Sequence, residues 1–279
     1  MAGTSQPHSP KVVVVMPAYN AARTLERTYR DIPTGTVDHV ILVDDVSRDE
    51  TVTISRQLGL NTIVHIQNRG YGGNQKTCYF EALKEDADVI VMLHPDYQYD
   101  ATKIPELIAP ILRGEADMVL GSRLLEDNAR AGGMPLWKYV ANRGLTALEN
   151  MAFQRRLSEY HTGLRAYSRR MLQTIPFLLN SDDFVFDTQV IAQAVAFGFH
   201  IAEIPVATRY FKEASSVNFR RSVTYGLETV ATVIEFLLDR WGIRRSRRLR
   251  VQLRHVVSPH YHQDLFDREN CNNVRSESA

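Results

Sequence analysis

The side chains best suited to chemistry follow an apolar run in "VIVMLHPDYQYD", residues 89–100. His94, Asp96 and Gln98 place an imidazole, a carboxylate and an amide directly after a segment that should be buried. Such groups hydrogen-bond polar ligands and can bind divalent cations. We therefore expect a buried strand to deliver a ligand site at its carboxyl end.

Short β-branched runs alternate with segments of helical period along the first half of the chain. The runs cover residues 11–17, 39–45, 61–67, 88–96 and 117–123. Strands that alternate with helices at this spacing form βαβ units and a parallel sheet buried on both faces. The predicted fold class is therefore α/β.

Polar residues collect where four of these strands end, at 17–20, 44–45, 68–70 and 94–100. In such a sheet, ligands bind beyond the carboxyl ends of the strands, where helix N-termini favour anions. Any single loop is polar for ordinary reasons, but four polar strand ends together favour a binding site.

The pattern changes after residue 124. Residues 135–153 and 187–199 have helical period, and residues 200–206 have a strand pattern. We divide the chain into a disordered tail at 1–10, a domain at 11–219 with halves at 11–123 and 124–219, an amphipathic helix at 220–242, and a poorly ordered basic tail at 243–279.

Composition excludes several classes of protein. The 279 residues carry 33 basic and 32 acidic side chains, so the formal charge of +1 gives no reason to expect nucleic acid as a partner. Cys78 and Cys271 are too few and too distant for a disulfide framework, which fits a reducing compartment. No apolar run approaches the roughly 18 residues of a membrane span. We expect a cytoplasmic protein.

Two nucleotide-binding motifs are absent or incomplete. The first strand lacks the GxGxxG turn of dinucleotide dehydrogenases. The stretch "GYGGNQKT", residues 70–77, is similar to a phosphate-binding P-loop, but Gln75 stands where its last glycine belongs. Because that glycine allows the backbone to approach phosphate, an ATPase is a weak alternative.

The stretches "VVVVMPAYN", "VILVDDVSRDET", "NRGYGGNQK", "VIVMLHPDYQYD" and "VLGSR", in this order, resemble family 2 glycosyltransferases of the GT-A fold. "YHTGLRAYSR", "FVFDTQVIAQAV" and "AEIPVATRYFKEASSV" are similar to the dolichyl-phosphate mannose synthase branch and its bacterial polyprenyl-phosphate relatives. The resemblance covers about residues 11–225. It implies inverting transfer of a sugar from a UDP- or GDP-sugar, with residues 11–123 as the nucleotide-binding half and 124–219 as the acceptor half.

The resemblance also implies a divalent metal that neutralises the departing diphosphate. The family pattern Asp-x-Asp-x-Gln reads His94-Pro95-Asp96-Tyr97-Gln98 here, so Asp96 and Gln98 match while His94 replaces the first carboxylate. Imidazole suits Mn²⁺ better than Mg²⁺, so we predict Mn²⁺ as the preferred metal, with His94 ligating or supporting a water ligand. A nucleotide-sugar binding protein without turnover, disabled by His94, is a further alternative.

Donor-binding residues carry over from the same motifs. They are Pro17, Ala18, Tyr19, Asn20, Asp44, Asp45, Asn68, Gly70, Gly72, Asp96 and Arg123. A carboxylate can accept from a ring N–H of a pyrimidine or guanine base, which gives the aspartate pair a chemical role. The glycines permit a close approach at the start of a helix, whereas Lys76 inside that helix is as easily solvated as bound to a ligand.

The acceptor decides which residues are catalytic. A lipid phosphate is already ionised and needs only cations, for which Arg123, Arg143, Arg165 and Arg209 match or lie close to basic positions of the branch. A hydroxyl of a glycan or small molecule needs a base, and Asp187 falls where hydroxyl-accepting members place it. The predicted catalytic set is Asp96, Asp187, Arg165 and Arg209, with a polyprenyl phosphate as the first choice of acceptor.

The amphipathic helix leaves two hypotheses open. An apolar stripe recurs at three to four residues, formed by Val223, Leu227, Val230, Ile234, Leu237 and Trp241, and six arginines follow between residues 244 and 254. The helix packs on the domain or on the second chain of a homodimer, or it lies on the anionic cytoplasmic face of a membrane.

Overall fold

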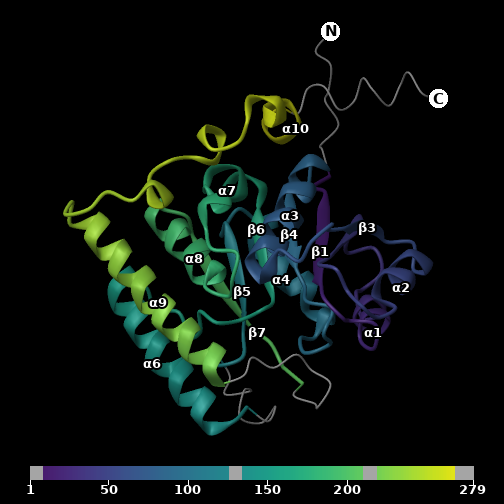
Figure 1. Cartoon of the computed structure of the whole chain (residues 1–279), viewed down its shortest axis with the longest axis horizontal. Helices are drawn as coiled ribbons and strands as arrows, with labels where there is room; N and C mark the ends of the chain where they lie inside the picture. The colour runs from purple at the N-terminus through teal and green to yellow at the C-terminus, as the bar shows by residue number, and fades with distance from the viewer. Residues whose placement is uncertain (1–8, 126–133, 210–218, 268–279) are drawn as a thin grey trace.

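The computed structural model describes residues 9–125, 134–209 and 219–267, and its centre is one mixed sheet (Figure 1). The strand order is β3-β2-β1-β4-β6-β5-β7. The strands are β1 (Val12–Ala18), β2 (His39–Asp44), β3 (Asn61–Val64), β4 (Val89–Met92), β5 (Met118–Ser122), β6 (Arg165–Ser168) and β7 (Ile201–Pro205). All neighbours are parallel except β6, which is antiparallel to β4 and β5. The predicted α/β class and parallel sheet are confirmed, and β6 was missed.

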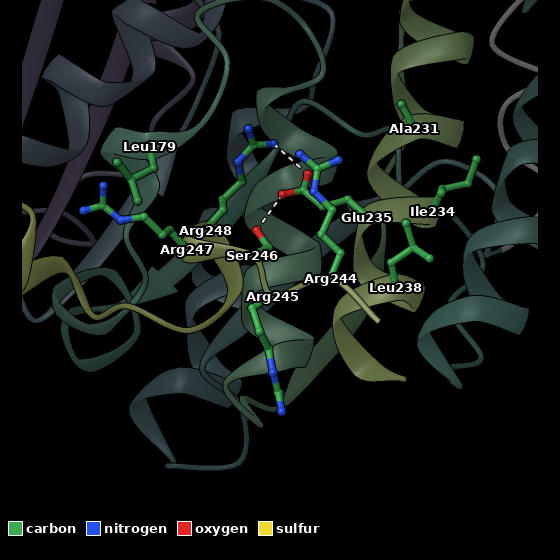
Figure 2. A pocket seen from close by; sticks show the side chains of 10 residues that line it. All are labelled: Leu179, Ala231, Ile234, Glu235, Leu238, Arg244, Arg245, Ser246, Arg247 and Arg248. Carbon is green, nitrogen blue, oxygen red and sulfur yellow. Dashed lines mark hydrogen bonds and ion pairs between the residues drawn. The ribbon is translucent and has the colours of Figure 1, made fainter. Parts of the chain in front are cut away.

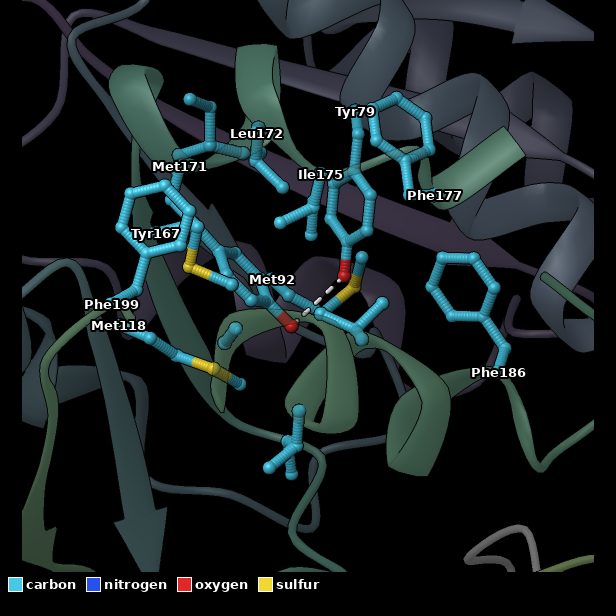
Figure 3. Close-up of a cluster of buried hydrophobic side chains, with 14 of the residues drawn as sticks. Tyr79, Met92, Met118, Tyr167, Met171, Leu172, Ile175, Phe177, Phe186 and Phe199 are labelled. Atoms are coloured by element: carbon cyan, nitrogen blue, oxygen red, sulfur yellow. Dashed lines mark hydrogen bonds between the residues drawn. The ribbon is translucent and has the colours of Figure 1, made fainter. Parts of the chain in front are cut away.

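Helices cover both faces of the sheet. They are α1 (Leu25–Arg30), α2 (Thr51–Gln57), α3 (Gly70–Lys84), α4 (Ile104–Leu112), α6 (Leu136–Phe153), α7 (Arg169–Thr174), α8 (Phe186–Ala196), α9 (Phe219–Arg240) and α10 (His262–Phe266). Val13 and Val15 of β1 point into one core and Val14 into the other, because successive strand residues face opposite sides. Figure 3 shows the first core, where the hydroxyl of Tyr79 on α3 donates to that of Tyr167 on β6 over 3.1 Å.

The central strands bring their carboxyl ends to one edge. β1 pairs in parallel with both β2 and β4, with Ala18 opposite Asp44 and Val15 opposite Met92. The loops after these strands therefore meet, as parallel topology requires. Asn74 of α3 ties two of the ends together by donating to the carbonyl of Val43 over 3.0 Å.

The segment after α9 folds against the domain. Leu249, Leu253, Val257 and Leu265 are buried in the same core as Phe236 of α9. The prediction of a poorly ordered tail from residue 243 is therefore wrong as far as residue 267, and the remainder lies outside the described residues. The arginines between these apolar positions concealed their burial. None of the helices in the described ranges has the length and apolarity needed to cross a membrane.

Candidate active site

A cleft of about 1030 Å³ lies at the carboxyl ends of the central strands. One wall comes from the loops after β1, β2, β3 and β4, and the other from residues 161–163, 181–184 and the start of α9. The cleft is thus built from both halves of the predicted domain. Its volume is ample for a nucleotide sugar, because ligand pockets typically measure about 300–1,000 Å³.

The predicted site residues divide into two groups. Those that line the cleft are Pro17, Ala18, Tyr19, Asn20, Asp45, Asn68, Gly70, His94, Asp96, Gln98 and Asp187. Those that do not line it are Asp44, Gly72, Arg123, Arg165 and Arg209.

The cleft loops hold an unusual backbone. Asn20, Val46 and Tyr97 have φ values of 52°, 65° and 60°. This left-handed conformation is disfavoured for side chains other than glycine, and most of all for a β-branched one such as Val46. Hydrogen bonds fix the loops: the amide of Asn20 donates to the Ser47 hydroxyl, and its side-chain oxygen accepts from the amide of Arg48, both over 2.8 Å. Backbone strain of this kind collects at functional sites.

The two aspartates after β2 have different surroundings. Asp45 accepts from the amides of Arg69 and Gly70 over 2.7 and 3.0 Å and lies 2.8 Å from Nδ1 of His65. Asp45 therefore anchors the start of α3. Asp44 is buried, and its Oδ2 accepts from the amide of Ser47, while its Oδ1 has no hydrogen-bond partner among the described residues. Such an oxygen is suited to an N–H supplied by a ligand.

The glycines of α3 serve packing. A Cβ at Gly72 would meet the carbonyl oxygen of Ser181 at 2.5 Å, and one at Gly70 would meet that of Asp182 at 2.7 Å. Lys76 is buried, and its Nζ donates to Oδ1 of Asp182 over 2.6 Å, which excludes the alternative that Lys76 is solvated. These contacts lock α3 of the first half to the second half of the domain.

Asp96 is the predicted metal ligand with a suitable environment. Burial raises its pKa to about 6, and Oδ1 accepts from the amide of Gln98 over 3.0 Å. A divalent cation beside it would offset that cost of burying a charge. No group of three histidine, cysteine or acidic side chains within the described ranges could hold a metal. The residues fit a metal whose remaining ligands are phosphate oxygens of the donor, a common arrangement for Mg²⁺.

His94 is bound to its neighbours. Burial lowers its pKa to about 4, so the imidazole is neutral near pH 7. The Tyr71 hydroxyl donates its single hydrogen to Oδ2 of Asp187 over 2.8 Å, so in the 3.1 Å contact with Tyr71 the Nε2 of His94 must be the donor. Nε2, which carries that hydrogen, cannot ligate a metal, whereas Nδ1 of the same neutral ring keeps its lone pair.

Asp187 is enclosed by donors. Besides Tyr71, Gln75 donates to Oδ1 over 3.0 Å, and Arg165 forms an ion pair with the same oxygen. Arg165 is 1% exposed, so its guanidinium stabilises Asp187 and does not reach the cleft. Burial and the charge of Asp187 raise the pKa of Tyr71 well above its usual value, which keeps its hydroxyl a donor.

Of the other predicted phosphate-binding arginines, Arg123 and Arg209 are also paired, and Arg143 is exposed but does not line the cleft. Arg123 forms an ion pair with the buried Glu159. Arg209 stacks on the ring of Tyr97 at 4.5 Å and lies 3.5 Å from Asp31. The arginines that line the cleft are Arg48, Arg69 and Arg221. Arg221 was missed because the start of α9 carried no motif.

A second chain of polar groups, also missed, lies in the wall formed by the second half. Nδ1 of His161 lies 2.6 Å from the hydroxyl of Tyr225, and Nε2 lies 3.0 Å from Oε2 of Glu149, although the angle there does not make a hydrogen bond. Glu149 is fully buried, while His161 and Tyr225 line the cleft. Burial, and next the charge of Glu149, raises the pKa of Tyr225. The only sequence signal was "YHTG" in the stretch that resembles the polyprenyl-phosphate branch.

Known proteins share this chain's sequence pattern. The model of glycosyl transferase family 2 matches residues 13–176, more than half of the chain. An uncharacterized protein of Methanocaldococcus jannaschii is 29% identical over 206 residues, which are 74% of this chain and 84% of that protein. The UDP-N-acetylglucosamine–dolichyl-phosphate N-acetylglucosaminyltransferase of Methanococcus voltae is 26% identical over 216 residues, 71% of this chain and 86% of that protein.

A solved structure shares its fold. Glucosyl-3-phosphoglycerate synthase of Mycobacterium tuberculosis, in complex with Mg²⁺ and UDP, superposes with a TM-score of 0.63 at 21% identity, covering 85% of this chain and 81% of that one. The family match, the strand order and this superposition agree. The chain is a member of glycosyl transferase family 2 with the GT-A fold.

Proposed function

We propose that this protein is an inverting glycosyltransferase that moves a sugar from a UDP-sugar to the phosphate of a polyprenyl phosphate. The choice of acceptor rests on the partners of the Asp187 carboxylate. Its oxygens accept hydrogen bonds from Tyr71 and Gln75 and form an ion pair with Arg165. A phosphate acceptor is ionised near neutral pH and requires no base. The name of the Methanococcus voltae relative, a dolichyl-phosphate transferase, supports the same class of acceptor.

The donor occupies the wall formed by the first half in this proposal. The Oδ1 of Asp44, which has no partner among the described residues, accepts the ring N–H of uracil. Because Asp44 is buried, the loop after β2 must first move to expose this oxygen. Arg48 and Arg69 supply positive charge to the diphosphate. UDP is favoured over GDP because the Methanococcus voltae relative is named for a UDP-sugar and the superposed structure contains UDP.

Asp96 and Gln98 would hold a divalent cation that neutralises the departing diphosphate. Oxygen ligands suit both Mg²⁺ and Mn²⁺, and a preference for Mn²⁺ would come from Nδ1 of His94, because Nε2 is a donor to Tyr71. His94 then acts on the site by holding Tyr71, which in turn holds Asp187.

The acceptor enters along the wall formed by the second half. Arg221 is the cleft arginine on that wall, and it takes over the role first assigned to Arg165 and Arg209. Arginine holds phosphate oxygens in a bidentate fork. Since a polyprenyl chain stays in a bilayer, the protein works at the cytoplasmic surface of a membrane.

A hydroxyl acceptor is the second candidate, and one specific observation favours it. If His161 carries its hydrogen on Nε2, its Nδ1 can accept the hydrogen of Tyr225. The oxygen of Tyr225 could then take a proton from an acceptor hydroxyl and pass its own proton to His161. Tyr225 and His161 together would supply the base in place of Asp187.

Release of nucleoside diphosphate tests the proposal. UDP- and GDP-sugars are supplied with Mg²⁺, Mn²⁺ or EDTA, with and without a short-chain polyprenyl phosphate. We expect UDP release that needs metal and rises with the lipid. Tyr225→Phe separates the candidates: it reduces kcat by roughly 10²–10⁴-fold if Tyr225 relays the acceptor proton, and by less than about tenfold if the acceptor is a phosphate. Donor binding without release under any condition would instead indicate a hydroxyl acceptor that the assay lacks, or a binding protein.

A further inference from the structure

The outward face of α9 is apolar although nothing covers it among the described residues. Val223, Leu227, Ile234 and Trp241 are 47%, 67%, 51% and 64% exposed. Their spacing places them on one stripe of the helix, while the opposite face, including Phe236, is buried in the core. The stripe is about 27 Å long at 1.5 Å per residue. An apolar surface of this size on a soluble domain marks a contact with another partner.

The neighbouring helix extends this surface. α6 and α9 run side by side along the edge of the molecule, away from the sheet (Figure 1). On α6, Leu136, Trp137 and Val140 are 64%, 44% and 60% exposed. The only acidic residue of α6, Glu149, is fully buried, so the exposed charges of this helix are positive.

Arginines gather at the carboxyl end of the stripe. Figure 2 shows a pocket of about 570 Å³ that Ala231, Ile234 and Leu238 share with the arginines of residues 244–248. Arg248 pairs with Glu235 over 3.2 Å. Arg244, Arg245 and Arg247 are exposed, and no carboxylate in the described ranges lies within ion-pair distance of their guanidinium groups. Positive charge is thus unbalanced next to apolar side chains.

We propose that this docking face, the outward stripe of α9 with Arg244, Arg245 and Arg247, binds the surface of an anionic phospholipid membrane. The stripe enters the boundary between headgroups and acyl chains, and the arginines bind lipid phosphates. Two copies of the chain would bring like charges together, and a nucleic acid would leave the apolar stripe in water. An anionic bilayer satisfies both features.

Docking would also orient the cleft. Arg221 and Tyr225, on the same helix, line the cleft wall assigned to the acceptor. These two residues lie on the face of α9 opposite the stripe, so in the docked protein the helix, roughly 10 Å in diameter, separates the cleft wall from the lipids, and this consequence alone rests on the proposed function. Binding to lipid is independent of it, because the docking face contains no residue assigned to catalysis.

Co-sedimentation of the full chain with vesicles tests the proposal without donor or acceptor. We expect binding to vesicles that contain phosphatidylglycerol, weaker binding as salt rises, and little binding to phosphatidylcholine alone. Ile234→Glu should lower binding by about tenfold or more, while Ile66→Glu, at a residue 101% exposed outside the docking face, should not. Arg244→Ala with Arg245→Ala should lower it by about 25-fold, roughly fivefold per arginine.

The matched control for the arginines is Arg30→Ala with Arg113→Ala, which removes two exposed arginines from other surfaces. Equal binding to both vesicle types, or equal effects of the paired variants, would overturn the proposal. So would a wild-type dimer in sedimentation equilibrium that Ile234→Glu dissociates. Loss of vesicle binding in millimolar inorganic phosphate, but not in chloride of equal ionic strength, would show a site for a soluble anion instead.

Discussion

Asp187→Asn separates a structural role of this carboxylate from a catalytic one. The change keeps the size of the side chain but leaves the guanidinium of Arg165, 1% exposed, without its countercharge. Removing one partner of a buried ion pair typically costs about 3–5 kcal/mol. For a domain of this size, that loss corresponds to a drop in Tm of roughly 6–10 °C. We expect kcat, measured well below the new Tm, to fall less than about tenfold.

Thermal unfolding and UDP release are measured on the same preparations. Asp31→Asn is the matched control, because Asp31 faces Arg209 in a pair whose side chains are 30% and 45% exposed. Such exposed pairs contribute about 0–1 kcal/mol, so this variant should melt close to the wild type. Adding Arg165→Met to Asp187→Asn should restore much of the stability, since it removes the unpaired buried charge. A fall in kcat of a thousandfold or more with an unchanged Tm would refute the structural role and make Asp187 the base.

Three further predictions follow from local geometry. Gly72→Ala should lower the free energy of unfolding, measured in urea, by about 1–3 kcal/mol, because its Cβ would meet the Ser181 carbonyl at 2.5 Å. Gly144→Ala on α6, where nothing lies within 4 Å of the new Cβ, should raise it by up to about 1 kcal/mol. Val46→Gly should raise the free energy of unfolding by roughly 0.5–1 kcal/mol, because glycine adopts a φ of 65° without steric strain. An unchanged urea midpoint would show that the backbone at Val46 is not strained. The pKa of Asp96 is raised to about 6, so its protonated form favours folding at low pH and that contribution is lost as pH rises through 6. Asp96→Asn should therefore raise Tm at pH 8 but not at pH 4, and Mn²⁺ with UDP should raise the wild-type Tm only above pH 6.

The sheet was predictable because its strands are simple. β1, β2 and β4 are buried on both faces, which demands an unbroken apolar run that can be read from the sequence. β6 has the sequence Arg-Ala-Tyr-Ser, and its Arg165 is buried only because Asp187 neutralises it. Such a strand has no apolar run and no alternation, so its pairing partners alone reveal it.

The last segment was misjudged for a related reason. Leu249, Leu253 and Val257 are spaced four residues apart between arginines. The local charge density indicated a solvated tail, but these apolar side chains are buried in the core, with the turn of Leu249 against α8 and the turn of Leu253 against α7. The four-residue spacing was a signal of burial, and the charge of the arginines between these residues concealed it.

The sequence by itself determined the fold class and the edge of the sheet that carries the cleft. The carboxyl ends of parallel strands meet at one edge of the sheet, whatever the directions of their side chains. The sequence therefore located Tyr19, Asn68 and Asp96. Only the tertiary structure decided which charged groups pair. Arg165 meets Asp187 and Lys76 meets Asp182, although the second pair is 106 residues apart in sequence. A charge in a buried site must be neutralised by whatever lies within a few ångströms, and the packing of distant elements fixes that neighbour.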